Sequence, residues 1–134
     1  MTTGYSGTPL AKKLGIKAGF RVLLVDEPDY YPTLFDDLPE IITELDNAKP
    51  VDFIHLFALK FNDLENHFDQ CKDRLAKNGI MWVSWPKKAS KIETDLDGNI
   101  VREYGLNHGL VDVKVCAVDE TWSGLKFMYR VKDR

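Results

Sequence analysis

The chain lacks most of the features that mark a redox, metal or membrane protein. It has 2 cysteines among 134 residues, and neither Cys71 nor Cys116 has a CxxC partner or a histidine at metal-ligand spacing. Both are predicted to be small buried side chains. No apolar run approaches the ~20 residues that cross a membrane, and the first residues hold no secretory core. We therefore expect a cytoplasmic protein without a metal site or a membrane partner.

Charge of one sign is also scarce. The chain has 18 lysines and arginines against 21 acids, a net charge of −3, which excludes a dominantly basic nucleic-acid-binding protein. The run KKASK beside Trp82 and Trp85 is too weak a basic footprint to predict a nucleic-acid partner. A length of 134 residues with 44% hydrophobic side chains predicts a single globular domain over 1–134.

Motifs for phosphate binding and hydrolysis are absent. The sequence has no P-loop, HExxH or GxSxG pattern. Ser84 and His55, on neighbouring predicted strands, come nearest to a nucleophile and its base, but no sharp turn follows to expose the hydroxyl. His55 lies in a strand between Phe53 and Phe57, so we expect a hydrogen-bonded core imidazole. No catalytic residue is predicted.

Apolar runs and helical patterns alternate along the first three quarters of the chain. Buried parallel strands are predicted at 21–25, 51–59 and 80–85. Short helices are predicted at 9–14 and 31–38, and longer ones over 61–77, ended by Asn78-Gly79, and over 95–108. Residues 40–45 fit either a helix or an edge strand, with a slight preference for the strand.

The end of the chain has a period of two. Apolar side chains alternate with polar ones from Val111 to Ala117 and again from Leu125 to Val131, with turn chemistry in between. This pattern predicts an antiparallel hairpin added to a mostly parallel sheet. The fold class is therefore α/β, a three-layer sandwich with five secure strands and one doubtful strand.

The order of these elements resembles the class I S-adenosylmethionine-dependent methyltransferases. LGIKAGFRVLLVD looks like the entry to their first strand, LAKNGIMWVSWP like their fifth strand, and GLVDVKVCAVDETWSGLKFMYRVK like their final hairpin. The resemblance implies a Rossmann-like sheet. A more specific resemblance, over nearly the whole chain, is to a bacterial family catalogued as a domain of unknown function, through TGYSGTPLAKKLGIK, DFIHLF, WVSWPKKAS and VDVKVCAVDETWSGLKFMYR. It implies no activity.

The turn after the first strand departs from the methyltransferase pattern. That family has a glycine-rich turn there, which lets the backbone approach the cofactor, whereas residues 26–31 (DEPDYY) contain no glycine. Asp46 follows Asp26 by 20 residues, where an acid would meet a ribose hydroxyl. The stretch from Asp26 to Val51 is too short for the two further strand–helix units of a seven-stranded core. We therefore predict no cofactor, and S-adenosylmethionine only under the alternative below.

Ligands of open α/β sheets bind beyond the carboxyl ends of the strands. The residues expected there combine carboxylates, ammonium groups and aromatic rings, which suit a small anionic or aromatic ligand. They are Asp26, Glu27, Tyr30, Tyr31, Lys60, Trp85, Lys87, Lys88 and Trp122.

These observations favour a non-catalytic, methyltransferase-like binding or regulatory module. One alternative is a divergent S-adenosylmethionine-dependent methyltransferase or another small-ligand enzyme. The other is an interaction module that pairs with a protein partner, or with a second copy of the chain, through a sheet edge or the Trp122 hairpin.

Overall fold

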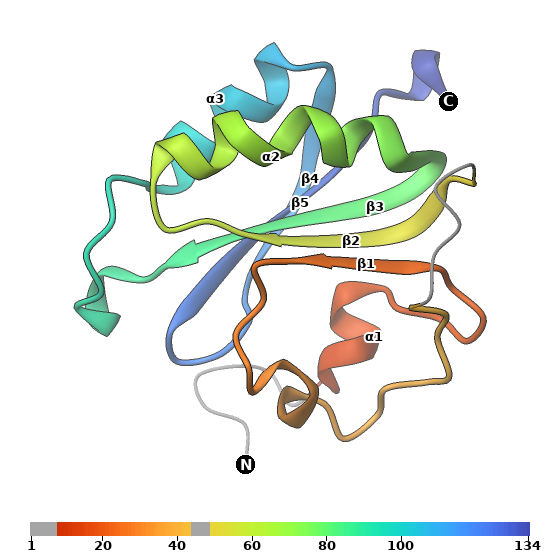
Figure 1. The fold of residues 1–134 in the computed structure, drawn as a ribbon, viewed down its shortest axis with the longest axis horizontal. Helices are drawn as coiled ribbons and strands as arrows, with labels where there is room; N and C mark the ends of the chain where they lie inside the picture. Colours follow the sequence, from red (N-terminus) through yellow and green to blue (C-terminus); the bar gives the residue numbers. More distant parts are fainter. Residues whose placement is uncertain (1–7, 44–48) are drawn as a thin grey trace.

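The computed structural model describes residues 8–43 and 49–134. A mixed sheet of five strands, in the order β1-β2-β3-β5-β4, forms the middle layer of an α/β sandwich (Figure 1). The strands are β1 (Val22–Val25), β2 (Val51–Phe57), β3 (Leu75–Pro86), β4 (Leu110–Ala117) and β5 (Trp122–Tyr129). The helices are α1 (Leu10–Leu14), α2 (Phe61–Arg74) and α3 (Gly98–Asn107), with short 3₁₀ turns η1 (Tyr31–Leu34), η2 (Lys88–Ser90) and η3 (Val131–Asp133). The predicted fold class is confirmed.

The two faces of the sheet carry different covers. Helices α2 and α3 pack on one face, and α1 and η1 pack on the other (Figure 1). Side chains alternate along β2, so that Ile54 and Leu56 enter the core under α2 while Phe53 and Phe57 enter the core under α1. Both faces of β2 are therefore buried, as its continuous apolar sequence predicts.

The predicted C-terminal hairpin is also present. Strand β5 pairs antiparallel with both β3 and β4, whereas β1, β2 and β3 pair parallel. Helix α3 lies close to this hairpin because Gly105 lacks a side chain, and a Cβ there would overlap the Phe127 ring. The polar side chain of Asp97 caps the helix by accepting a hydrogen bond from the Ile100 amide at 2.9 Å.

Two helix predictions are corrected by the structure. The helix predicted at 31–38 is the single turn η1, which ends because Phe35 is extended at φ −113° and ψ 128°. The helix predicted to end at Asn78-Gly79 ends at Arg74, because Leu75 already pairs with Val51 at the start of β3. The register between β2 and β3 shifts between Val51 and Phe53, which accommodates the extra residues.

The doubtful strand at 40–45 is described in part. Ile42 forms one isolated parallel bridge with Arg21, the residue before β1. Residues 44–48, and with them the candidate ribose acid Asp46, lie outside the described residues. Within the described ranges, no helix is both long enough and apolar enough to cross a membrane.

Candidate functional site

The chain changes sides of the sheet between β1 and β2. The connection that follows β1 packs through Tyr31, Leu34 and Phe35 into the core under α1. The connection that follows β2 is α2, which packs on the opposite face. A crevice opens beyond the carboxyl ends of parallel strands wherever successive connections take opposite faces, and such crevices hold ligands in open α/β sheets.

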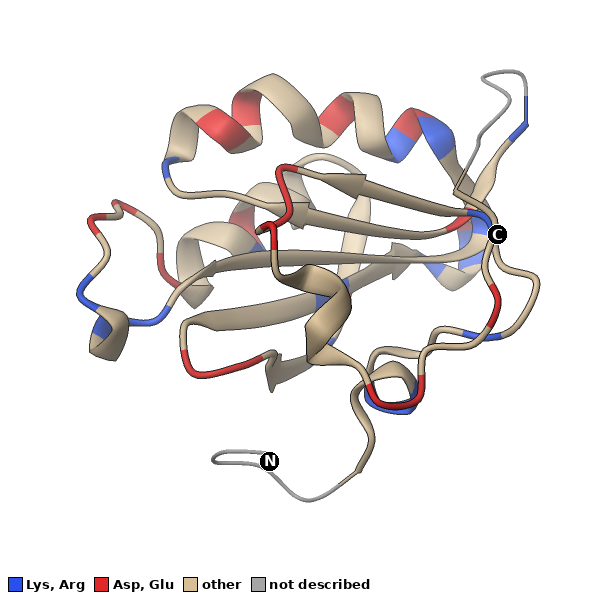
Figure 2. Ribbon diagram, turned by 60° about the horizontal axis from the view of Figure 1, so that its bottom comes forward, with Lys and Arg blue, Asp and Glu red and all other residues tan. Residues whose placement is uncertain are grey.

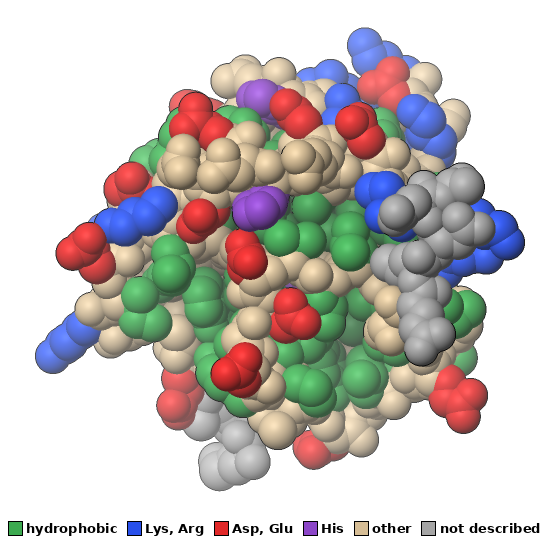
Figure 3. Space-filling view, in the orientation of Figure 1, with side chains coloured by type: hydrophobic (Ala, Val, Ile, Leu, Met, Phe, Trp, Pro, Cys, Tyr) green, Lys and Arg blue, Asp and Glu red, His purple; other side chains and the backbone are tan. Residues whose placement is uncertain are grey.

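A groove of about 420 Å³ lies at this place, a volume suited to a small ligand. We call it the β1–β2 groove; its walls are Asp26, Pro28, Phe57, Leu59, Asp63, Ile92 and Trp122. Five of these side chains are apolar or aromatic and two are carboxylates, with no cation among them. On the face shown in Figure 3, hydrophobic side chains reach the surface below α2 between acidic ones. The lining therefore favours an apolar or aromatic ligand that carries positive charge.

Asp26 follows β1 directly and has a left-handed conformation, with φ 57°. Such a backbone is costly for a residue with a Cβ and is found repeatedly at functional sites. The Asp26 carboxylate is 59% exposed and lies 3.3 Å from Nε2 of His67 on α2. The second carboxylate of the groove, Asp63, accepts hydrogen bonds through Oδ2 from the amides of Leu59 and Lys60, at 2.9 and 3.0 Å. His67 thus contacts the Asp26 carboxylate, and two backbone amides position that of Asp63.

Two adjacent tyrosines of the glycine-free turn hold the aromatic walls of the groove. The hydroxyl of Tyr30 accepts a hydrogen bond from Nε1 of Trp122 at 3.0 Å. The hydroxyl of Tyr31 lies 2.8 Å from Nδ1 of His55, whose ring stacks on Phe57 with a centroid distance of 4.2 Å. The Trp122 and Phe57 rings meet edge to face at 5.0 Å. Where the related fold would have glycines, this chain has side chains that position an aromatic surface.

The pair of His55 and Ser84 is buried too deeply to act as a nucleophile and base. His55 Nε2 lies 2.7 Å from Ser84 Oγ, yet both residues are 0% exposed. Burial lowers the pKa of His55 to about 3, and burial, then Glu27, raises the pKa of Tyr31. The neutral imidazole thus links two hydroxyl groups in the core, which confirms the predicted core histidine.

A loop after β3 closes one side of the groove. Thr94 donates a hydrogen bond from Oγ1 to the Leu59 carbonyl at 2.6 Å, and Asp95 accepts one from the Phe61 amide at 2.7 Å. The exposed Lys60 and Glu93 form an ion pair at 2.7 Å. These contacts at the amino end of α2 place Ile92 of the same loop against the groove.

The structure brings some of the predicted site residues together and separates others. Asp26 and Trp122 line the groove, and Tyr30 and Tyr31 support its walls. Trp85 instead packs in the core under α2 and α3. Glu27 and Lys88 are exposed and do not line the groove. Lys60 forms an ion pair with Glu93. The amide of Lys87 donates a hydrogen bond to the Thr121 carbonyl, which places Lys87 beside β5.

Five lining residues, Pro28, Phe57, Leu59, Asp63 and Ile92, were not predicted as site residues from the sequence. Phe57, Leu59 and Asp63 follow or end the second strand, so the rule that ligands bind beyond strand ends could have included them. Ile92 stands in a loop whose course depends on the contacts with α2, and no sequence pattern indicates it.

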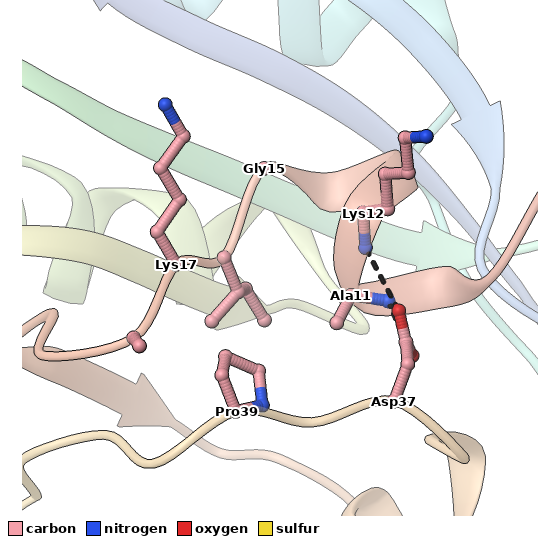
Figure 4. Close-up of a pocket in the computed structure, with 8 residues that line it drawn as sticks. Ala11, Lys12, Gly15, Lys17, Asp37 and Pro39 are labelled. Atoms are coloured by element: carbon pink, nitrogen blue, oxygen red, sulfur yellow. Dashed lines mark hydrogen bonds between the residues drawn. The ribbon is translucent and has the colours of Figure 1, made fainter.

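A second cavity, of about 320 Å³, lies between α1 and residues 37–39 (Figure 4). Its acid, Asp37, accepts hydrogen bonds from the amides of Ala11 and Lys12, at 3.1 and 3.2 Å, and thereby caps α1. The Lys12 and Lys17 side chains point away from the cavity (Figure 4). In the part of the chain that the structure describes, no group of three His, Cys, Asp or Glu side chains could hold a metal ion.

Solved structures of methyltransferases share this fold. The chain is similar to ribosomal protein L11 methylase from Lactobacillus delbrueckii subsp. bulgaricus, with a TM-score of 0.55 and 12% identity over 90% of this chain and 75% of that one. It is similar to magnesium protoporphyrin IX methyltransferase from Synechocystis PCC 6803 with bound S-adenosylmethionine, with a TM-score of 0.57 and 8% identity over 90% and 74%. It is also similar to Burkholderia thailandensis 1,6-didemethyltoxoflavin-N1-methyltransferase with bound S-adenosylhomocysteine. The TM-score is 0.53 and the identity is 12%, over 88% of this chain and 73% of that one.

No family model matches the sequence, and no curated protein matches it. The resemblance to the bacterial family of unknown function is therefore not confirmed, whereas the methyltransferase-like fold is.

The prediction that the fold has no cofactor is corrected by these comparisons. It rested on the missing glycines of the first turn, but several structures with this fold contain S-adenosylmethionine or S-adenosylhomocysteine. The absence of glycine excludes one way of approaching the ligand, through bare backbone, and leaves side-chain contacts open.

Proposed function

We propose that this protein binds S-adenosylmethionine in the β1–β2 groove and is a divergent methyltransferase. The observation that carries the proposal is the placement of the groove. It lies where the connections change faces of the sheet, and it is lined by two carboxylates and two aromatic rings. Structures with this fold hold the same cofactor or its demethylated product.

The residues of the groove fit the chemistry of this cofactor. S-adenosylmethionine supplies an electrophilic methyl group on a sulfonium cation. The carboxylates of Asp26 and Asp63 attract positive charge, and the rings of Phe57 and Trp122 give the groove an aromatic wall for the ligand. Pro28 occupies the turn where the related fold has glycine, so we infer that side chains rather than the backbone hold the ligand here.

Asp26 has the leading role in this scheme. Its left-handed backbone turns the carboxylate at the mouth of the groove, and His67 holds the carboxylate from α2. The Tyr30 hydroxyl keeps the Trp122 ring in place through its hydrogen bond. Acceptor groups would reach the groove beside the exposed side chains of Leu59 and Ile92, which are 42% and 40% exposed.

Isothermal titration calorimetry with S-adenosylmethionine and S-adenosylhomocysteine tests the proposal. We expect saturable binding in the micromolar range and at least tenfold weaker binding for Asp26→Asn, because a charged contact is lost. Asp29→Asn, an exposed acid three residues away that does not line the groove, is the matched control and should bind like the wild type.

The outcomes separate the two functional readings. Binding followed by transfer of a labelled methyl group to a cell-extract acceptor supports the enzyme. Binding without any transfer supports the regulatory module that the sequence favours. Absence of binding at millimolar concentration contradicts the proposal.

A further inference from the structure

The face of the hairpin that points toward α1 carries lysines from two strands. Lys114 on β4 and Lys126 on β5 are direct cross-strand partners. Cys116 is two residues beyond Lys114 and so lies on the same face. Its partner across the strands is Gly124, where a Cβ would lie 3.0 Å from the Trp82 ring in the core under α1. The side chains of Lys114, Cys116 and Lys126 therefore lie on the face of the sheet that α1 covers.

Two further lysines approach the same place from other elements. Lys13 on α1 donates a hydrogen bond from Nζ to the Ala117 carbonyl, next to Cys116, at 3.2 Å. Lys87 follows β3 and is held beside β5 by the bond between its amide and the Thr121 carbonyl, at 2.8 Å. We call Lys13, Lys87, Lys114 and Lys126 together the lysine face.

Three lysines act on the thiol of Cys116. Burial raises the pKa of this thiol, while Lys13, Lys114 and Lys87 lower it. Burial and the neighbouring Lys114 lower the pKa of Lys126. Like charges directly opposite one another destabilise a sheet, so the protein keeps an arrangement that a bound anion would relieve.

Two acids of the hairpin, Asp119 and Glu120, lie in its turn, and other acids line the far side of the sheet. Figure 2 shows acidic positions along α2, with basic ones toward its carboxyl end, where Lys72 and Arg74 lie. Helix α2 covers the opposite face of the sheet from the lysine face. Four of the 13 lysines of a chain with a net charge of −3 thus lie together on one side of the hairpin.

We propose that the lysine face binds a compact phosphate-bearing anion, of the size of pyrophosphate or the diphosphate of a nucleotide. Ammonium groups bind phosphate oxygens as point charges and need no bidentate geometry. Three of the lysines converge on the single site at Cys116, which fits a compact anion better than the extended backbone of a nucleic acid. This site is separate from the β1–β2 groove, and the proposal stands whether or not S-adenosylmethionine binds there.

Calorimetric titration with inorganic pyrophosphate tests the proposal. We expect saturable binding that weakens as salt concentration rises and that falls at least tenfold in the double variant Lys114→Gln/Lys126→Gln. The matched control Lys49→Gln/Lys132→Gln removes the same charge from exposed positions before β2 and after β5. It should bind pyrophosphate like the wild type.

A second measurement locates the site independently of those variants. Alkylation of Cys116 by iodoacetamide should slow at least severalfold when pyrophosphate is added, because the anion both covers the thiol and cancels the lysine field. Denatured protein, in which the face does not exist, should show no such protection. Cys71 is buried and serves as the internal reference.

Three results would overturn the proposal. One is equal pyrophosphate affinity for the wild type and for Lys114→Gln/Lys126→Gln. Another is no saturable binding up to about 10 mM pyrophosphate. The third is binding of a single-stranded RNA oligonucleotide through the same lysines with no response to pyrophosphate, which would assign the face to a nucleic acid instead.

Discussion

The buried imidazole of His55 should make the protein sensitive to acid. The ring is 0% exposed, and burial lowers its pKa to about 3 from its usual value of 6.5. The unfolded chain therefore binds a proton at a higher pH than the folded protein does. Stability from this group is complete above about pH 6.5 and is lost progressively as the pH falls toward 3.

The size of the effect follows from the two pKa values. A pH of 5 lies about 1.5 units below the pKa of the ring in the unfolded chain, so the unfolded ring is protonated while the folded ring is still neutral. Each unit of difference between pH and pKa corresponds to ~1.36 kcal/mol. The wild type should therefore lose about 2 kcal/mol of unfolding free energy between pH 7.5 and pH 5 through His55 alone. Other groups add their own contributions, so the comparison needs a variant without this ring.

Urea unfolding followed by circular dichroism at pH 7.5 and pH 5 measures the effect. His55→Gln should be less stable at pH 7.5, because the Tyr31 and Ser84 hydroxyls lose a fitted partner, but its stability should fall by about 2 kcal/mol less on acidification. Ser84→Ala, which removes one hydrogen-bond partner of the ring but keeps the buried ring itself, is the control and should keep the wild-type difference. Equal pH dependence of the His55→Gln variant and the wild type would show that the buried ring does not cause the loss of stability in acid. If that variant does not fold, an NMR titration of the wild type replaces it, and a His55 ring that protonates above pH 5 would be the contrary result.

Three further variants test other contacts of the fold by chemical denaturation. Trp82→Phe removes the hydrogen bond from Nε1 to the Leu14 carbonyl, 2.8 Å long and buried, and should cost about 2–4 kcal/mol, whereas an unchanged stability would contradict that bond. Gly105→Ala should cost about 1–3 kcal/mol or more because its Cβ would overlap the Phe127 ring, while Gly98→Ala, 3.5 Å from Trp85, should be nearly neutral. Lys126→Gln should raise stability by about 0.2–1 kcal/mol at low salt, since it removes the like-charge pair with Lys114, and the gain should shrink at high salt.

The sheet could be predicted from the sequence because its signals are local. The apolar runs at 21–25, 51–59 and 80–85 have no polar side, which indicates strands buried on both faces, and the structure confirms β1, β2 and β3 there. The helix boundary near Asn78-Gly79 was wrong for a non-local reason. Leu75 pairs with Val51, and that tertiary pairing overrides the turn chemistry that follows.

The candidate site was predicted in part. Topology alone placed Asp26 and Trp122 at the carboxyl ends of the strands, and both line the groove. Trp85 also stands at a strand end, but side chains alternate, and its ring points into the core under α3. Ile92 reaches the groove only because Thr94 and Asp95 of its loop bond to the start of α2, a contact between segments 33–35 residues apart. No pattern in one sequence reveals such a contact.

The most direct test of the proposed cofactor site is an NMR titration of the indole N–H resonances with S-adenosylhomocysteine. Trp122 lines the groove, whereas the Trp82 indole is buried and bonded to Leu14, and Trp82→Phe and Trp85→Phe assign the three signals. We expect the Trp122 resonance to shift and saturate while that of Trp82 stays in place. A full titration that leaves Trp122 unmoved would contradict the assignment of the β1–β2 groove as the cofactor site.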